Sequence, residues 1–195
     1  VGDLVRAIKA ETGLAVTLSL GERDDEDLRD WRQGGADRFL LRFETSDASL
    51  YGVIHPSLPG AVSDRIAQLG RMREMGYEIG SGVMVGIPGQ TWESLARDIE
   101  LFGELDIDMI GIGPFLPSPR TPLGGDGAEG WRASPGEQVP NDELTTLKVV
   151  ALTRLPFGKL RVQAATSSKS ACPFPTPSPT DRSFKAPVSA AWIEE

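Results

Sequence analysis

The charged residues that could do chemistry stand together in the stretch DRFLLRFE, which begins at Asp37. The stretch has the apolar content of a β-strand, and alternation places Arg38, Arg42 and Glu44 on one face of it. Charges on the face of an apolar sheet cost free energy unless they pair with one another or bind a polar ligand. Two interpretations stay open: an internal network of ion pairs, or a pocket in which Arg38 and Arg42 bind an anion or an amino-acid carboxylate. We favour the pocket.

Other polar side chains belong to neighbouring predicted elements. Thr17 and Ser19 stand at the end of the preceding strand. Arg65 falls in the first turn of a predicted helix, where a cation gains nothing from the helix dipole. Two interpretations stay open: a ligand or carboxylate partner beside it, or an ordinary surface arginine. His55, the single histidine, precedes a proline in a stretch typical of a loop. Alone it forms neither a metal site nor a triad, and we interpret it as structural.

A third feature is the turn GIPGQT, which follows an apolar run. Gly86 and Gly89 allow positive φ or close backbone approach, Pro88 stiffens the turn, and Thr91 can cap a helix that begins at Trp92. A helix start with free N–H groups can receive an anion. The pattern therefore fits either a phosphate cradle or a tight packing turn.

These residues must be positioned by alternating helices and strands. Helical spacing of apolar residues alternates five times with short β-rich runs, which predicts an α/β fold with a parallel sheet. Such a sheet is either doubly wound or part of a (β/α) TIM-type barrel. We favour a partial barrel of about five strands with an unpaired edge at each end, because no G-x-G-x-x-G opens a βαβ unit. The predicted strands cover residues 14–20, 37–43, 77–86, 107–115 and 160–165.

The domain division follows the composition. Residues 1–166 form the partial barrel, interrupted at 118–141 by a loop rich in glycine and proline that is either a lid or an inserted surface loop. Residues 167–195 are rich in proline and lack a period, so we expect a disordered tail or an aberrant chain end. The chain opens on Val1 inside a helical pattern, and we expect it to be a fragment.

Composition limits the partners. The chain has 195 residues and a net charge of −8, which disfavours binding to nucleic acid or to an anionic membrane and favours small molecules or proteins. There is no apolar run of membrane-spanning length, so we expect a soluble, cytoplasmic protein. The single cysteine, Cys172, excludes an internal disulfide and a set of cysteine metal ligands from this chain alone.

Six segments, in order, resemble a known family over about residues 1–155. GSGVMVGIPGQTWESL is similar to the G-x-I-x-G-L-P-G-E/Q-T element at the fifth strand of radical S-adenosylmethionine enzymes. With TLSLGER, GADRFLLRFET, MGYEIGSG, DIDMIGIGPFLPSPRTPL and LTTLKVVALTRL, the chain resembles most closely the HydE family of [FeFe]-hydrogenase maturases. Biotin synthase and methylornithine synthase are the alternatives within the superfamily.

The resemblance implies a radical enzyme with S-adenosylmethionine and a [4Fe–4S] cluster as cofactors. The cluster ligands, a C-x-x-x-C-x-x-C motif, are absent, so we expect them upstream and expect no catalytic or metal-binding residue in this chain. By position, Ser19, Glu44 and Arg65 resemble the contacts to S-adenosylmethionine or its neighbour. Phe43 departs from the pattern, which has histidine there.

Thr17, Arg38 and Arg42 resemble the family's substrate or anion pocket. The implied substrate is a small molecule or an iron complex, and the implied partners include other hydrogenase maturases. The whole protein would be an enzyme, while this chain alone is expected to be inactive. Two hypotheses of other kinds stay open: a non-catalytic partial barrel that binds a small anion or a partner protein, and a phosphate-binding barrel that uses the GIPGQT turn.

Overall fold

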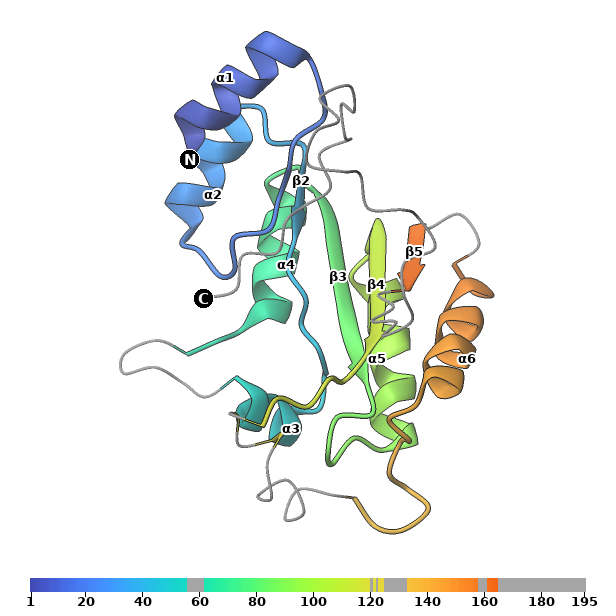
Figure 1. Cartoon of the computed structure of the whole chain (residues 1–195). Helices are drawn as coiled ribbons and strands as arrows, with labels where there is room; N and C mark the ends of the chain where they lie inside the picture. Colours follow the sequence, from blue (N-terminus) through green and yellow to red (C-terminus); the bar gives the residue numbers. More distant parts are fainter. Residues whose placement is uncertain (56–61, 120, 122, 125–132, 158–160, 165–195) are drawn as a thin grey trace, which may run out of the picture.

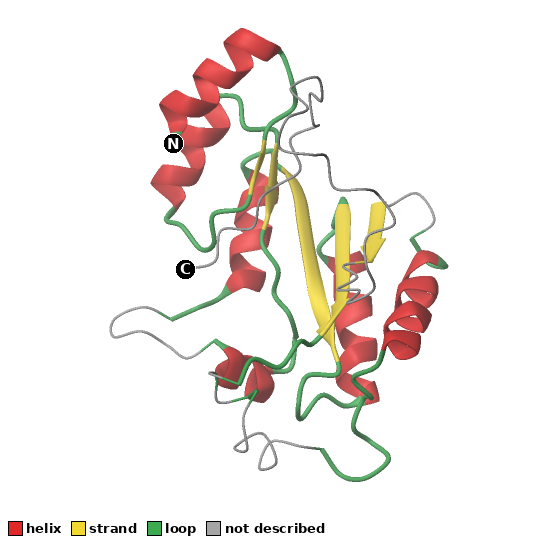
Figure 2. Ribbon diagram, in the orientation of Figure 1, coloured by secondary structure: helices red, strands yellow, loops and turns green. Residues whose placement is uncertain are grey.

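The structure is a computed structural model, and it describes residues 1–55, 62–119, 121, 123–124, 133–157 and 161–164. Helices and strands alternate along the chain (Figures 1 and 2). The helices are α1 (Gly2–Thr12), α2 (Asp25–Gln33), α3 (Ala48–Ile54), α4 (Arg65–Glu74), α5 (Trp92–Glu104) and α6 (Glu143–Arg154). The strands are β1 (Thr17–Leu18), β2 (Arg38–Leu40), β3 (Glu78–Val85), β4 (Met109–Pro114) and β5 (Arg161–Ala164).

All five strands are parallel and lie in the order β1-β2-β3-β4-β5. A doubly wound sheet would reverse this order at a switch point, whereas an unreversed order with right-handed crossovers keeps the helices on one face. Figure 1 shows α4 and α5 behind the sheet and α6 beside β5. The predicted arc of a (β/α) barrel is therefore confirmed, and within the described residues β1 and β5 form its two edges.

Helix boundaries follow local hydrogen bonds. Asp24, Asp47, Asp64, Thr91 and Asp142 each precede a helix and accept a hydrogen bond from the backbone N–H three residues ahead. At the other ends, glycines with φ of 64°, 104° and 86° follow α1, α2 and α4 and allow the left-handed turn that ends each helix. These glycines are Gly13, Gly35 and Gly76.

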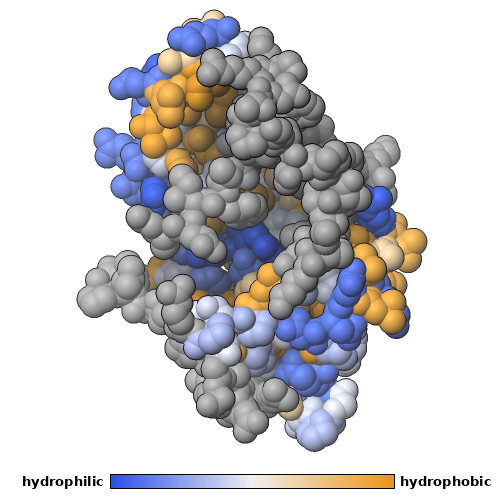
Figure 3. Space-filling model, viewed as in Figure 1, coloured by the Kyte–Doolittle hydropathy of each residue, from blue (hydrophilic) through white to orange (hydrophobic). Residues whose placement is uncertain are grey.

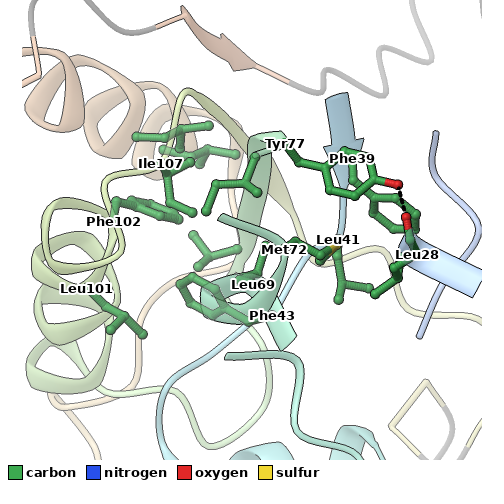
Figure 4. Packing of buried hydrophobic residues seen from close by; sticks show 14 of the residues in the cluster. Leu28, Phe39, Leu41, Phe43, Leu69, Met72, Tyr77, Leu101, Phe102 and Ile107 are labelled. Carbon is green, nitrogen blue, oxygen red and sulfur yellow. Dashed lines mark hydrogen bonds between the residues drawn. The ribbon is translucent and has the colours of Figure 1, made fainter. Parts of the chain in front are cut away.

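The hydrophobic core lies between the sheet and its helices (Figure 4). Phe39 is buried between Trp31, whose ring stacks on it, and Tyr77, whose ring meets it edge-on. The Tyr77 hydroxyl donates to the Leu28 carbonyl at 2.6 Å, so this buried polar group is satisfied. Phe43 continues the core toward α5, where it packs on Phe102.

Side chains along β2 alternate between the two faces of the sheet, so the sequence determines which of them lie on the face opposite the helices. Phe39, Leu41 and Phe43 are buried on the helix side, so Arg38 and Arg42 point to the face without helices. Figure 3 shows hydrophilic side chains across the middle of that face. No helix in the described part of the chain is long and apolar enough to cross a membrane.

The structure differs from prediction in three elements. The strand β1 covers only Thr17–Leu18, although residues 14–20 were predicted. The helix α3 was not predicted; His55 lies just after its end, outside any helix or strand, as predicted. The ladder of β2 ends at Leu40, although the strand was predicted to reach residue 43. The predicted tail at 167–195, with Cys172, lies outside the described residues.

Candidate functional site at the carboxyl edge of the sheet

The candidate site begins where the chain leaves β2. Glu44 has φ of 65°, a left-handed conformation that costs free energy for any residue but glycine. Its backbone is nevertheless tied to the next strand, because Glu44 N–H donates to the Gly82 carbonyl at 3.0 Å and Glu44 forms a parallel bridge with Val83. The predicted alternation ends here, since the left-handed turn redirects the chain. Strain of this kind is typical of functional positions.

Arg42 and Glu44 form a partly satisfied pair. Arg42 Nη2 lies 3.3 Å from Glu44 Oε2 and donates to the Val83 carbonyl at 2.7 Å. Both side chains are largely buried, with 24% and 14% exposure. Even so, Arg42 Nε and Glu44 Oε2 make no hydrogen bond within the described structure. The donor Arg42 Nε and the acceptor Glu44 Oε2 are thus both buried without a hydrogen bond. Leaving them so costs free energy unless a ligand supplies the missing partners.

The raised pKa of Glu44 also indicates that this carboxyl is incompletely compensated. Burial raises the pKa of its carboxyl, and the charge of Asp98 adds to that effect. Arg42 and Arg65 lower the pKa but do not cancel the rise. A buried carboxyl with an incompletely compensated charge is a candidate for a functional group.

Arg65 supplies the second guanidinium at this edge. Its Nε donates to Glu22 Oε1 at 2.9 Å, and its Nη1 donates to the Arg42 carbonyl at 2.9 Å. The carboxylate partner of Arg65 is therefore Glu22. Burial raises the pKa of Glu22, but hydrogen bonds from Ser63 and Arg65 outweigh it and the net pKa is lowered. We call Glu22, Arg42, Glu44 and Arg65 the edge cluster.

A chain of side chains supports the edge cluster from α3. Ser63 donates to Glu22 at 2.6 Å and shares a hydrogen bond of 2.6 Å with the Tyr51 hydroxyl. The Tyr51 ring stacks on His55 with centroids 4.4 Å apart. Burial lowers the pKa of His55 to about 4, which leaves the imidazole neutral at pH 7. Its contacts are those of a packing residue.

Of the remaining predicted site residues, Thr17 and Arg38 lie away from this cluster, and Ser19 lies at the same edge of the sheet but makes no hydrogen bond to it among the residues that the structure describes. Arg38 stands at the start of β2, at the other end of the strand, and donates to Glu78 at 2.5 Å. Thr17 is the register partner of Arg38, and it is exposed. Ser19 is exposed just beyond β1, at the carboxyl edge. The structure thus brings Arg42, Glu44 and Arg65 together but does not bring Arg38 to them.

The GIPGQT turn lies beside the cluster at the end of β3, and its donors are used internally. Gly86 N–H donates to the side chain of Gln90 at 2.7 Å, and Gly89 N–H donates to Gln138 at 2.9 Å. Gly86 has φ of 85°, and a Cβ there would lie 2.5 Å from Asn141 Cα. The structure therefore favours the packing turn over the phosphate cradle.

Sequence reasoning missed Gln138 and Asn141. Gln138 Nε2 donates to the Ile87 and Val139 carbonyls, and Asn141 donates to the Phe115 carbonyl at 2.7 Å. The end of the loop at 118–141 is thus fastened to the turn, with a hollow of about 460 Å³ between the two. Isolated amides in a loop gave no periodic signal.

No group of three or more possible metal ligands occurs in the part of the chain that the structure describes. Its histidine is neutral and packed, and Cys172 lies outside that part. The described residues therefore do not fit an iron–sulfur cluster as its ligands.

Comparison with known proteins identifies the fold and the relatives. No family model matches the chain. The [FeFe] hydrogenase maturase subunit HydE of Thermotoga maritima is 40% identical over 173 residues, which are 89% of this chain and 45% of that protein. A 3-methylornithine synthase of Methanosarcina acetivorans is 32% identical over 84% of this chain and 42% of its own length. The crystal structure of methylornithine synthase (PylB) superposes with a TM-score of 0.65 and 28% identity, covering 83% of this chain and 43% of that chain.

Radical S-adenosylmethionine enzymes also appear among more distant structures that share the fold. The resemblance to HydE is confirmed over 89% of the chain. The chain spans less than half the length of these two curated relatives.

Proposed function

We propose that this chain forms part of the barrel wall of a radical S-adenosylmethionine enzyme of the HydE type, and that its edge cluster binds the amino-acid part of S-adenosylmethionine. The observation that carries the proposal is the buried, strained Glu44, whose Oε2 lacks a hydrogen bond beside the unsatisfied Nε of Arg42.

The chemistry of the cluster fits that ligand. The methionine part of S-adenosylmethionine carries an ammonium and a carboxylate, the two groups that Glu44 and a guanidinium would bind. An ammonium beside Glu44 would also favour its ionised form and offset the cost of burial. Ser19 lies at the same edge and is exposed, so we assign it to the same ligand.

When bound beside a [4Fe–4S] cluster, S-adenosylmethionine supplies radical chemistry. The residues of this chain would bind and orient the molecule, and the cluster ligands would come from residues outside this chain. The packed Gly86 turn would form a rigid wall beside the ligand, because its backbone donors are already satisfied.

The substrate pocket is assigned to the face of the sheet without helices. Arg42 points to that face, and Thr17 and Arg38 are register partners on it. Arg38 donates its Nε to Glu78, whereas Arg42 keeps a buried Nε without a hydrogen bond among the described residues, so we expect Arg42 to be the stronger anion-binding group. A small molecule or an iron complex would be the substrate.

The HydE type is favoured over the other relatives by identity, 40% against 32% for methylornithine synthase. HydE is named as a hydrogenase maturase subunit, so maturation of the [FeFe]-hydrogenase cluster is the proposed process, and other maturases are the proposed partners. Methylornithine synthase-like or biotin synthase-like chemistry is the alternative. The cytoplasmic location expected from the sequence stays a prediction.

The test is calorimetric titration of the 195-residue chain with S-adenosylmethionine. Glu44→Gln should weaken binding about tenfold or more, because a charge-assisted contact is lost. Glu78→Gln is the matched control, since Glu78 also pairs with an arginine of β2 but at the other end of the strand. Equal affinity in both variants, or no binding by the unmodified chain, would overturn the proposal.

A second candidate function is anion binding without radical chemistry, and the unsatisfied Nε of Arg42 favours it. In that case sulfate or phosphate would bind, Arg42→Ala would abolish binding, and S-adenosylmethionine would give no heat. The titration therefore separates the two candidates.

A further inference from the structure

Asp98 of α5 is a fully buried carboxylate outside the edge cluster. Its Oδ1 accepts two hydrogen bonds from Ser46, one from the backbone N–H at 2.5 Å and one from the hydroxyl at 2.7 Å. Its Oδ2 is buried and makes no hydrogen bond of ordinary geometry within the described structure, although burial, which raises the pKa of the carboxyl, is partly offset by Ser46 and the nearby Thr45 side chain. Such a group costs free energy, so stability alone does not explain an aspartate here.

The residue that Asp98 holds lies two positions after Glu44. The turn from Glu44 to Ser46 is fixed from two sides, because Glu44 N–H donates to Gly82 of β3 and Ser46 donates to Asp98 of α5. Thr45, between them, is fully buried. A glutamate keeps a left-handed backbone conformation only where surrounding contacts hold it there, and these hydrogen bonds do so.

We propose that Asp98 is a positioning residue for ligand binding: by anchoring Ser46 it holds the turn in which Glu44 is left-handed and so directs the Glu44 carboxylate toward the ligand. Removing the anchor would let Glu44 relax to a favourable φ and turn its side chain away. This inference rests on the proposed function, because its readout is binding of S-adenosylmethionine at Glu44.

The charge of Asp98 has a second, smaller effect on the ionisation of Glu44. Burial raises the pKa of Asp98 to about 6, and the charge of Asp98 raises the pKa of Glu44. Asp98 therefore also disfavours an ionised Glu44 until a cationic group is bound nearby.

The first test compares three variants in titrations of the full chain with S-adenosylmethionine. Asp98→Ala should weaken binding about tenfold, the scale of losing hydrogen bonds to a charged group. Asp98→Asn keeps an acceptor oxygen for Ser46 and should stay within about twofold of the unmodified chain. Asp37→Ala is the control, because Asp37 also accepts a backbone N–H from another element, that of Val16 at 2.7 Å, but stands at the far end of β2. It should leave the affinity unchanged.

A double-mutant cycle then shows whether Asp98 acts through Glu44. In a Glu44→Gln background, Asp98→Ala should cause no further loss, whereas independent effects would add. If Glu44→Gln itself leaves binding unchanged, the proposed function fails. If Glu44→Gln weakens binding but Asp98→Ala does not, the positioning role fails and the proposed function stands.

Ser46→Ala covers the case in which Asp98→Ala does not fold. It removes only the hydroxyl donor and should weaken binding in the same direction by about threefold. Unchanged affinity together with unchanged hydrogen exchange at the Ser46 amide would contradict the anchor.

Discussion

Arg65 joins Glu22 and Arg42 through a single guanidinium: its Nε donates to Glu22 Oε1 at 2.9 Å and its Nη1 to the Arg42 carbonyl at 2.9 Å. The segment between β1 and α2, the chain just after β2 and the start of α4 are thereby fastened at one point. Because the guanidinium is only 24% exposed, solvent screens these contacts less than those of a surface pair.

Arg65→Ala should therefore lower the free energy of unfolding by about 2 kcal/mol, the loss expected for hydrogen bonds to a charged group. Arg29→Ala is the control, because Arg29 pairs with Asp25 on the exposed surface of α2 at 3.3 Å. Its effect should stay below about 0.5 kcal/mol. Urea denaturation of both variants measures the difference, and similar losses would contradict a special role for Arg65.

Glu44→Gly should stabilise the fold and impair binding. Glycine adopts φ of 65° without strain, so the free energy of unfolding should rise by about 1 kcal/mol. Asp106→Gly is matched to it, since Asp106 has φ of 50° but lies in the turn after α5, at the opposite edge of the sheet. Thermal melts should show both variants stabilised, while only Glu44→Gly loses affinity for S-adenosylmethionine. A destabilised Glu44→Gly variant would show that its conformation is not strained.

The buried carboxyl of Asp98 predicts a pH dependence of stability. Its pKa is about 6 in the folded chain and about 4 when exposed, so between these values the folded state holds more protons. Its contribution to the free energy of unfolding is therefore present at low pH and declines as the pH rises through this window. Asp98→Asn removes that decline, because the amide does not titrate.

The advantage of Asp98→Asn over the unmodified chain should grow by about 2 kcal/mol from pH 4 to pH 7 and then stay level. Urea denaturation at a series of pH values measures this difference, in which the titrations common to both proteins largely cancel. A difference independent of pH would mean that Asp98 is not desolvated.

The Gly86 turn offers a test of packing. Gly86→Ala should destabilise the fold by about 2–3 kcal/mol or prevent folding, because the new Cβ would overlap the backbone of Asn141. Gly136→Ala has almost the same φ, 88° against 85°, but nothing within 4 Å of the new Cβ. The difference in melting temperature between the two variants isolates the clash from the backbone strain.

The fold was predictable where burial repeats along the chain. Phe39, Leu41 and Phe43 are buried at every second position, and the same alternation put Arg38 and Arg42 together on the opposite face of the strand. The cap glycines were predictable because positive φ strongly favours that residue. The helix α3 was missed, since seven residues give too few turns for a periodic signal.

The site was only partly predictable. Arg42, Glu44 and Arg65 stood out by charge in an apolar context, but their partners depend on contacts between distant segments. Nothing local shows that Glu44 is left-handed, because the tie to Gly82 and the anchor at Asp98 come from elements far along the chain. Arg38 looked equivalent to Arg42 in the strand pattern, and only the register with β3 places Glu78 beside it.

The most direct test of the central claim is an NMR titration of the ¹⁵N-labelled chain with S-adenosylmethionine. We predict saturable shifts of the amides of residues 42–46, 65 and 86–89, at the carboxyl edge of the sheet, with Val16 and Asp37 at the opposite edge unchanged. Shifts confined to the hollow between α2 and α4 that Asp25, Arg29 and Arg71 line, or the absence of saturable shifts, would contradict it.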